Sequence, residues 1–239
     1  MLTTGSMTWV KICGMTNLED ALVAVEAGVD AVGFIFYEKS PRCVNVETAR
    51  EIVEKLPEGV ETVGVFAGES LLRAAEVGAS VGFDSLQLYP LLAPNSLAVL
   101  ENAGFKHPAQ RKSGQRKIYF ALPISKLSLE EHGLAIEVAD PEGKFVALLL
   151  DSGNAQQPGG TGVTFDWNRA APAIEGLILR QQVVIAGGLT PQNVGEAMKI
   201  LKPWGVDVSS GVEARPGKKD PEKVRAFVRA VREMDRKVS

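Results

Sequence analysis

Short apolar runs alternate with amphipathic segments along most of this chain. The first run ends at Cys13, and the segment after it carries apolar residues at helical spacing, with Asn17 placed to cap a helix and Gly28 to end it. The same strand and helix unit repeats along the sequence. Strands are predicted over 9–13, 31–36, 62–66, 85–89, 117–123, 145–151, 183–186 and 206–209, and helices over 17–27, 46–56, 69–77, 95–103, 128–138, 165–179, 191–201 and 221–237.

Eight such units in 239 residues predict an α/β fold of the (β/α)8 TIM barrel type, built as a single domain. The continuous apolar run 146–150 is typical of a parallel strand that is covered on both faces. A doubly wound open sheet is the alternative, because the order of the strands in space cannot be read from the sequence. The barrel is expected to span residues 7–239. Residues 1–6 are interpreted as an N-terminal extension or a cloning remnant before a second start at Met7.

The composition restricts the kinds of molecule that this protein is expected to bind. The net charge of -3 gives no general attraction for nucleic acid or for an anionic membrane. No apolar stretch approaches the roughly 20 residues that would span a bilayer. The two cysteines, Cys13 and Cys43, suit neither a disulfide scaffold nor a metal site, which favours a reducing cytoplasm. Cys43 is interpreted as a packing residue, with no disulfide to Cys13.

In a barrel of this kind, chemistry is located where the strands end at their carboxyl side. Cys13 ends the first strand, and Lys11, two positions earlier, points to the same side. Asp151 ends the sixth strand, where apolar walls raise the pKa of a carboxyl and let it deliver a proton near neutral pH. Asp151 could instead only cap a turn with Ser152. We interpret Cys13 and Asp151 as a candidate catalytic pair.

Glycine-containing turns follow the last two strands. Glycine lets an anion approach backbone N–H groups closely, and barrels often bind phosphate at these two loops. The residues predicted to bind phosphate are Gly187, Gly188, Ser210 and Gly211. Residues 211–214 could form a short extra helix there, and residues 159–162 a flexible bordering loop.

Other polar residues have simpler interpretations. Arg42, after the second strand, could grip a carboxylate in a two-pronged manner. The basic stretch 106–117 lacks aromatic residues that would stack on bases, so a solvated loop is favoured. His107 and His132 lie outside the predicted strand ends, which argues against metal-dependent chemistry.

Together these segments resemble one enzyme family, phosphoribosylanthranilate isomerase of tryptophan biosynthesis. The matching segments are residues 10–16, 32–36, 39–42, 64–66, 150–152, 159–162, 186–189 and 206–213. The resemblance implies an Amadori rearrangement of a phosphorylated aminoaldose to an aminoketose. It also implies no cofactor and no metal. The expected partner is thus a small phosphorylated substrate, and the protein is expected to be a monomer or a homodimer.

The resemblance also implies roles for individual residues. Asp151 would be the general acid that opens the furanose ring, and Cys13 the general base that removes a proton from the neighbouring sugar carbon. Arg42 would hold the anthranilate carboxylate, and Lys11 and Asp207 would belong to the substrate-binding site. We add the hypothesis that Lys11 lowers the pKa of the Cys13 thiol.

The sequence departs from the family pattern in one region. The family usually has Gln-Leu-His-Gly after the fourth strand, whereas this chain has Tyr89 and Pro90 in place of the last two residues, and 105–117 looks extended. The related isomerase of histidine biosynthesis is an alternative, but that family has an aspartate where Cys13 stands. A barrel that binds a phosphorylated ligand without turning it over, or a subunit whose partner supplies the chemistry, would need neither Cys13 nor Asp151.

Overall fold

The structure is a computed structural model that describes residues 7–89, 99–100, 102, 105, 117–126, 145–153 and 162–238. Residues 1–6, the predicted helix 128–138 and most of the predicted helix 95–103 lie outside these ranges. The basic stretch 106–116 and both histidines lie outside them too.

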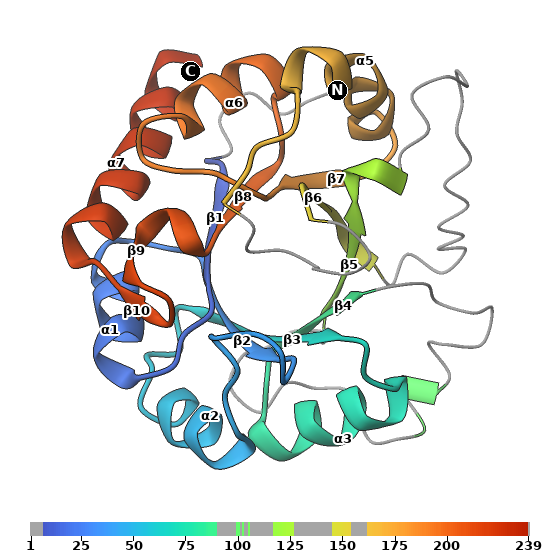
Figure 1. Ribbon diagram of the computed structural model, residues 1–239, viewed down its shortest axis with the longest axis vertical. Helices are drawn as coiled ribbons and strands as arrows, with labels where there is room; N and C mark the ends of the chain where they lie inside the picture. The colour runs from blue at the N-terminus through green and yellow to red at the C-terminus, as the bar shows by residue number, and fades with distance from the viewer. Residues whose placement is uncertain are drawn as a thin grey trace.

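Eight parallel strands close into a barrel (Figure 1). They are β1 (Trp9–Cys13), β2 (Ala31–Phe36), β3 (Glu61–Ala67), β4 (Ser85–Tyr89), β5 (Lys117–Pro123), β6 (Phe145–Asp151), β7 (Gln182–Ile185) and β8 (Gly205–Val208). The first and last strands pair with each other, with Lys11 opposite Asp207. This closure confirms the predicted barrel and excludes the open doubly wound sheet.

Helices surround the barrel on its outside (Figure 1). They are α1 (Leu18–Glu26), α2 (Val46–Val53), α3 (Leu71–Val81), α5 (Trp167–Ile178), α6 (Val194–Leu201) and α7 (Pro221–Val238). The predicted cap of the first helix is confirmed, because the side chain of Asn17 accepts a hydrogen bond from the N–H of Asp20 over 3.0 Å. No helix in the described ranges combines the length and the apolar character needed to cross a bilayer.

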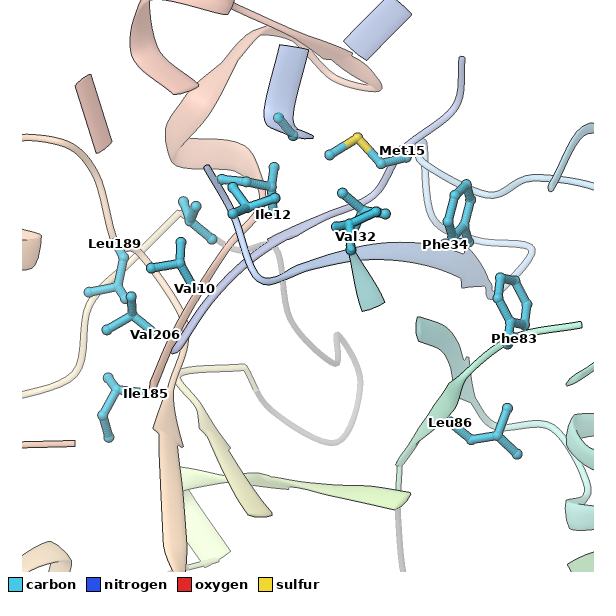
Figure 2. Packing of buried hydrophobic residues seen from close by; sticks show 14 of the residues in the cluster. Val10, Ile12, Met15, Val32, Phe34, Phe83, Leu86, Ile185, Leu189 and Val206 are labelled. Atoms are coloured by element: carbon cyan, nitrogen blue, oxygen red, sulfur yellow. The ribbon is translucent and has the colours of Figure 1, made fainter. Parts of the chain in front are cut away.

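The alternation of side chains along each strand creates two apolar layers. Val10 and Ile12 of β1 face outward into the layer between strands and helices, as Figure 2 shows. Trp9 and Cys13 of the same strand face inward, where Trp9 stacks on Tyr119. Each inward position near the carboxyl end of a strand therefore borders the barrel mouth.

The segment after β8 differs from the prediction. Residues 211–214 were expected to form a short helix, but the structure has a single 3-10 turn, Ser210–Val212, followed by β9 (Glu213–Arg215). This strand pairs with β10 (Lys218–Lys219) in a two-stranded antiparallel hairpin. The hairpin is stabilised by the ion pair between Glu213 and Lys219 and by the hydrogen bond from Nζ of Lys219 to the carbonyl oxygen of Cys13 on β1.

A buried polar cluster closes the opposite end of the barrel, at the amino ends of β3, β4 and β5. The Glu61 carboxylate, in a residue that is 5% exposed, accepts hydrogen bonds from the hydroxyls of Ser85 and Tyr119 and pairs with Lys117 over 3.2 Å. Because buried donors that lose their acceptor are costly, this carboxylate holds three strands in register.

We expect Glu61→Ala to reduce the free energy of unfolding by about 2–4 kcal/mol, since it leaves two buried hydroxyls without their acceptor. Urea denaturation followed by circular dichroism measures the change. Glu58→Ala, at an exposed position, is the matched control and should unfold like the wild type. Equal denaturation midpoints for the two variants would contradict a structural role for the cluster.

Candidate functional site

Buried charged groups gather at the carboxyl ends of the strands, inside the barrel. Lys11 on β1 and Asp207 on β8 form an ion pair with 2.7 Å between Nζ and Oδ2, and the two residues are 0% and 6% exposed. Burial opposes the charge of Lys11, but the nearby Asp207 outweighs it and holds the lysine pKa above its usual value. Lys11 therefore keeps its positive charge, and its partner in the ion pair is Asp207.

Cys13 lies beside this pair and is also buried. Burial raises the pKa of the Cys13 thiol; Lys11 lowers it, and Asp207 again raises it. Lys11 lowers the thiol pKa, as the hypothesis states, but it does not outweigh burial, so the net shift is upward. The physical reason is that desolvation of the thiolate is the largest effect on this pKa, and the nearby Asp207 carboxylate adds to it.

We expect Asp207→Asn to lower the pKa of the Cys13 thiol, because the charge of Lys11 then acts on the thiolate without compensation. The ultraviolet absorbance of the thiolate, titrated in a Cys43→Ser background so that only Cys13 reports, measures the change. Lys11→Met in the same background should shift the thiol pKa upward instead. A thiol pKa in Asp207→Asn equal to or above that of the background protein would contradict this account.

Asp151 is the second buried titratable group of the predicted pair, at 5% exposed. Its Oδ1 accepts a hydrogen bond of 2.6 Å from the N–H of Gly153, and its Oδ2 accepts one of 3.4 Å from the hydroxyl of Tyr89. Burial raises the pKa of Asp151 despite these two donors, as the sequence predicted. The carboxyl thus closes a local turn and also faces the barrel mouth.

Arg42 already binds a carboxylate of this chain. Its Nε and Nη2 each donate over 2.8 Å to the Glu213 carboxylate, and the residue is 8% exposed. The two-pronged grip that the sequence predicted is therefore made with a residue of the chain itself. Nη1 has no hydrogen-bonding partner among the described residues.

A fully buried lysine connects this arginine site to β1. Lys219 Nζ contacts Glu213 Oε1 at 3.0 Å and donates to the carbonyl oxygens of Cys13 at 2.7 Å and Ser209 at 3.2 Å. Sequence reasoning missed Lys219 and Glu213, because a basic run such as 218–219 looks like a solvated surface. Nothing in the sequence after the last strand indicates that the side chain of Lys219 is buried.

The four predicted phosphate-binding residues follow β7 and β8 as expected. Gly187 and Gly188 have positive φ values of 85° and 66°. A Cβ on Gly188 would lie 2.5 Å from the backbone nitrogen of Thr164, so no larger residue fits there. The bordering loop 159–161 lies outside the described residues.

The interpretation of Cys43 as a packing residue is wrong. Cys43 is exposed, not a packing residue, because its neighbours Arg42 and Val44 are buried and alternation turns Cys43 outward. Both cysteines are free, as expected.

A closed parallel barrel with a buried carboxyl, thiol and ion pair at its mouth defines a (β/α)8-barrel enzyme. Residues 10–230 match the family model for N-(5'phosphoribosyl)anthranilate (PRA) isomerase. The chain belongs to this family.

Individual relatives agree. An N-(5'-phosphoribosyl)anthranilate isomerase of Pelobacter propionicus is 42% identical over 227 residues, which cover 95% of this chain and 97% of that protein. A crystal structure of phosphoribosyl anthranilate isomerase in complex with reduced 1-(o-carboxyphenylamino)-1-deoxyribulose 5-phosphate is 34% identical, with a TM-score of 0.72 over 95% of this chain and 100% of that one. A crystal structure of monomers of the dimeric phosphoribosylanthranilate isomerase of Thermotoga maritima is 34% identical, with a TM-score of 0.71. The match covers 95% of this chain and 99% of that one.

Proposed function

We propose that this protein converts N-(5-phosphoribosyl)anthranilate to 1-(2-carboxyphenylamino)-1-deoxyribulose 5-phosphate, an aldose–ketose isomerisation in tryptophan biosynthesis. The observation that carries the proposal is the presence of Cys13 and Asp151, both buried at one barrel mouth, in a chain of this family. A base and an acid are the two groups that this rearrangement needs.

Asp151 acts first in this mechanism, as the general acid. Its raised pKa favours the protonated carboxyl, which donates to the furanose ring oxygen. The bond between the anomeric carbon and the ring oxygen then breaks, and the lone pair of the anthranilate nitrogen forms the C=N bond of an iminium. The product of the step is an open chain and an Asp151 carboxylate.

Cys13 acts second, as the general base. Its thiolate takes the proton from the carbon next to the iminium, and the electron pair of that C–H bond moves to give an enolamine, which tautomerises to the ketone. Because burial raises the thiol pKa, the thiolate is a minor form before substrate binds, and it is correspondingly basic. The Lys11 ammonium beside it stabilises the thiolate when it forms.

Substrate binding is assigned to groups around this pair. Arg42 would hold the anthranilate carboxylate through Nη1, while Glu213 fixes the orientation of the guanidinium. The N–H groups of Gly187 and Gly188 have no acceptor among the described residues, which supports their proposed role, with Ser210 and Gly211, in binding phosphate. Lys11 and Asp207 would contact the sugar hydroxyls between these two ends.

The test is a fluorescence assay of phosphoribosylanthranilate consumption by the purified protein, with the ketose product identified by chromatography against a standard. We expect turnover of this substrate and none of the aminoaldose used by the isomerase of histidine biosynthesis. Unchanged phosphoribosylanthranilate would refute the isomerase assignment and would favour a barrel that only binds phosphorylated ligands.

Two further assignments belong to the proposal. The chain is proposed to be a monomer or a homodimer, with the dimeric Thermotoga maritima relative as support for the second state. A reducing cytoplasm is proposed as its compartment, supported by two free cysteines.

A further inference from the structure

Tyr89, at the carboxyl end of β4, directs its hydroxyl at Asp151 on β6. The hydroxyl oxygen lies 3.4 Å from Oδ2 of Asp151, and Nε2 of Gln87 lies 3.4 Å from the same hydroxyl oxygen. When Asp151 is ionised it can only accept hydrogen bonds, so in that state Tyr89 donates to it and Gln87 donates to Tyr89. The three side chains form a hydrogen-bonded chain with a single direction that ends at Asp151.

The two oxygens of Asp151 have different environments. Oδ1 accepts the short bond of 2.6 Å from the N–H of Gly153, whereas Oδ2 has only the longer contact with Tyr89. Because an oxygen engaged by a strong donor resists protonation, the acidic proton resides on Oδ2. Tyr89 therefore contacts the oxygen from which the proton would be transferred.

We propose that Tyr89 is a positioning residue for the general acid of this enzyme, holding Oδ2 of Asp151 in place and stabilising the carboxylate that remains when the proton leaves. The hydrogen bond strengthens as charge develops on Oδ2, because bonds to charged acceptors are stronger than bonds to neutral ones. This inference deepens the proposed isomerase function and rests on it for its kinetic readout.

The other groups around Asp151 do not replace this contact. Within the described ranges, the titratable residues that face Asp151 and Tyr89 are Lys11 and Cys13 from β1 and Asp207 from β8. The ionisable residues of β5 contact Glu61 at the far end of the barrel, and β7 has none. Burial has the largest effect on the pKa of Asp151; Asp207 also opposes ionisation of this carboxyl, and Lys11 favours it. Removing the Tyr89 hydroxyl leaves Gly153 as the remaining hydrogen-bond donor to this carboxyl among the described residues.

The direct test is a carbon-13 NMR titration of the aspartate carboxyl groups in the whole protein, with the Asp151 signal assigned by its absence in Asp151→Asn. Tyr89→Phe should raise the pKa of Asp151 by about half a unit, the equivalent of one weak hydrogen bond. Gln87→Met should shift it in the same direction by less, since the hydroxyl loses the donor that orients it. Tyr119→Phe is the matched control: it removes a buried tyrosine hydroxyl at the other end of the barrel and should leave the Asp151 titration unchanged.

The kinetic readout is the pH profile of kcat/KM. Turnover needs the protonated carboxyl of Asp151 and the thiolate of Cys13 together, so the profile has one limb for each group. The limb whose midpoint matches the Asp151 pKa in the NMR titration marks this carboxyl. Tyr89→Phe should move this limb to higher pH by the same amount as in the NMR titration.

The NMR and kinetic results test the positioning role of Tyr89 and the proposed isomerase function separately. An Asp151 titration that is the same in the wild type, Tyr89→Phe and Gln87→Met overturns the positioning role, whatever the activity. A wild type that does not turn over phosphoribosylanthranilate overturns the proposed function, and the NMR titration still decides the role of Tyr89. If Tyr89→Phe fails to fold, Gln87→Met carries the test.

Discussion

Replacing Asp151 with asparagine is expected to reduce kcat/KM for phosphoribosylanthranilate by about 10²- to 10⁴-fold, the usual contribution of a general acid or base. An amide is nearly the same size as the carboxyl and can still accept the hydrogen bond from the N–H of Gly153. The change therefore removes the transferable proton with little effect on the turn. The initial rate of substrate fluorescence loss measures the effect.

Asp166→Asn is the matched control for this prediction. Asp166 is exposed and caps α5 by accepting from the N–H of Arg169, a role that asparagine fills equally well. This variant should keep wild-type kcat/KM. Full activity in Asp151→Asn would refute the assignment of the general acid while leaving the isomerase function intact.

Cys13→Ala is expected to cause a loss of similar size, because no base remains to remove the carbon-bound proton. Cys13→Asp should recover part of the activity, since a carboxylate beside Lys11 can accept the same proton. A covalent mechanism predicts otherwise: an adduct on sulfur could not form in either variant, and both would be equally inactive. Comparing kcat/KM among the wild type and the two variants distinguishes a base from a nucleophile.

The exposed second cysteine provides the control. Cys43→Ser should keep full activity, because the side chain of Cys43 points away from the buried site. The Sγ of Cys13 packs close to Gly33, so the thermal melting of each Cys13 variant must be measured alongside its rate. Wild-type kcat/KM in Cys13→Ala would exclude this thiol as the base.

The fold was readable from the sequence because its signal is local and repeated. Every predicted strand is present, several with the predicted bounds, such as β2, β4 and β5. The boundaries that differ have local causes. Helix α6 begins at Val194 and not at residue 191, because Asn193 accepts a hydrogen bond from the N–H of Thr190 and stabilises a turn before it. Strand β3 begins one residue early, at Glu61, because that carboxylate binds donors from two neighbouring strands.

The positions of the candidate site residues were also predictable, because the carboxyl ends of parallel strands meet at one mouth. Assigning the strands was enough to place Cys13, Asp151 and the turns after β7 and β8 at this mouth. The pKa of Cys13 was not predictable, since the charge beside a thiol depends on what pairs with that charge. Burial of the thiolate has the largest effect on this pKa, and Asp207, nearly two hundred positions along the chain from Lys11, adds to it.

Tyr89 illustrates the same limit. In the sequence it was a departure from a family pattern, and nothing in the order of residues indicated that its hydroxyl reaches the general acid. That contact joins β4 and β6, which lie on either side of β5, so it depends on the order of the strands in space.

The sequence by itself determined the barrel, its eight strands and the residue types at its mouth, because backbone periodicity and apolar burial act within each strand and helix unit. Only the tertiary structure decided that Asp207 compensates the charge of Lys11 and that Glu213 binds one edge of the Arg42 guanidinium. It also decided that the hydroxyl next to Asp151 is that of Tyr89. The physical reason is that hydrogen bonds and ion pairs act over a few ångströms in space. Barrel closure brings together partners that the chain separates by tens to hundreds of residues.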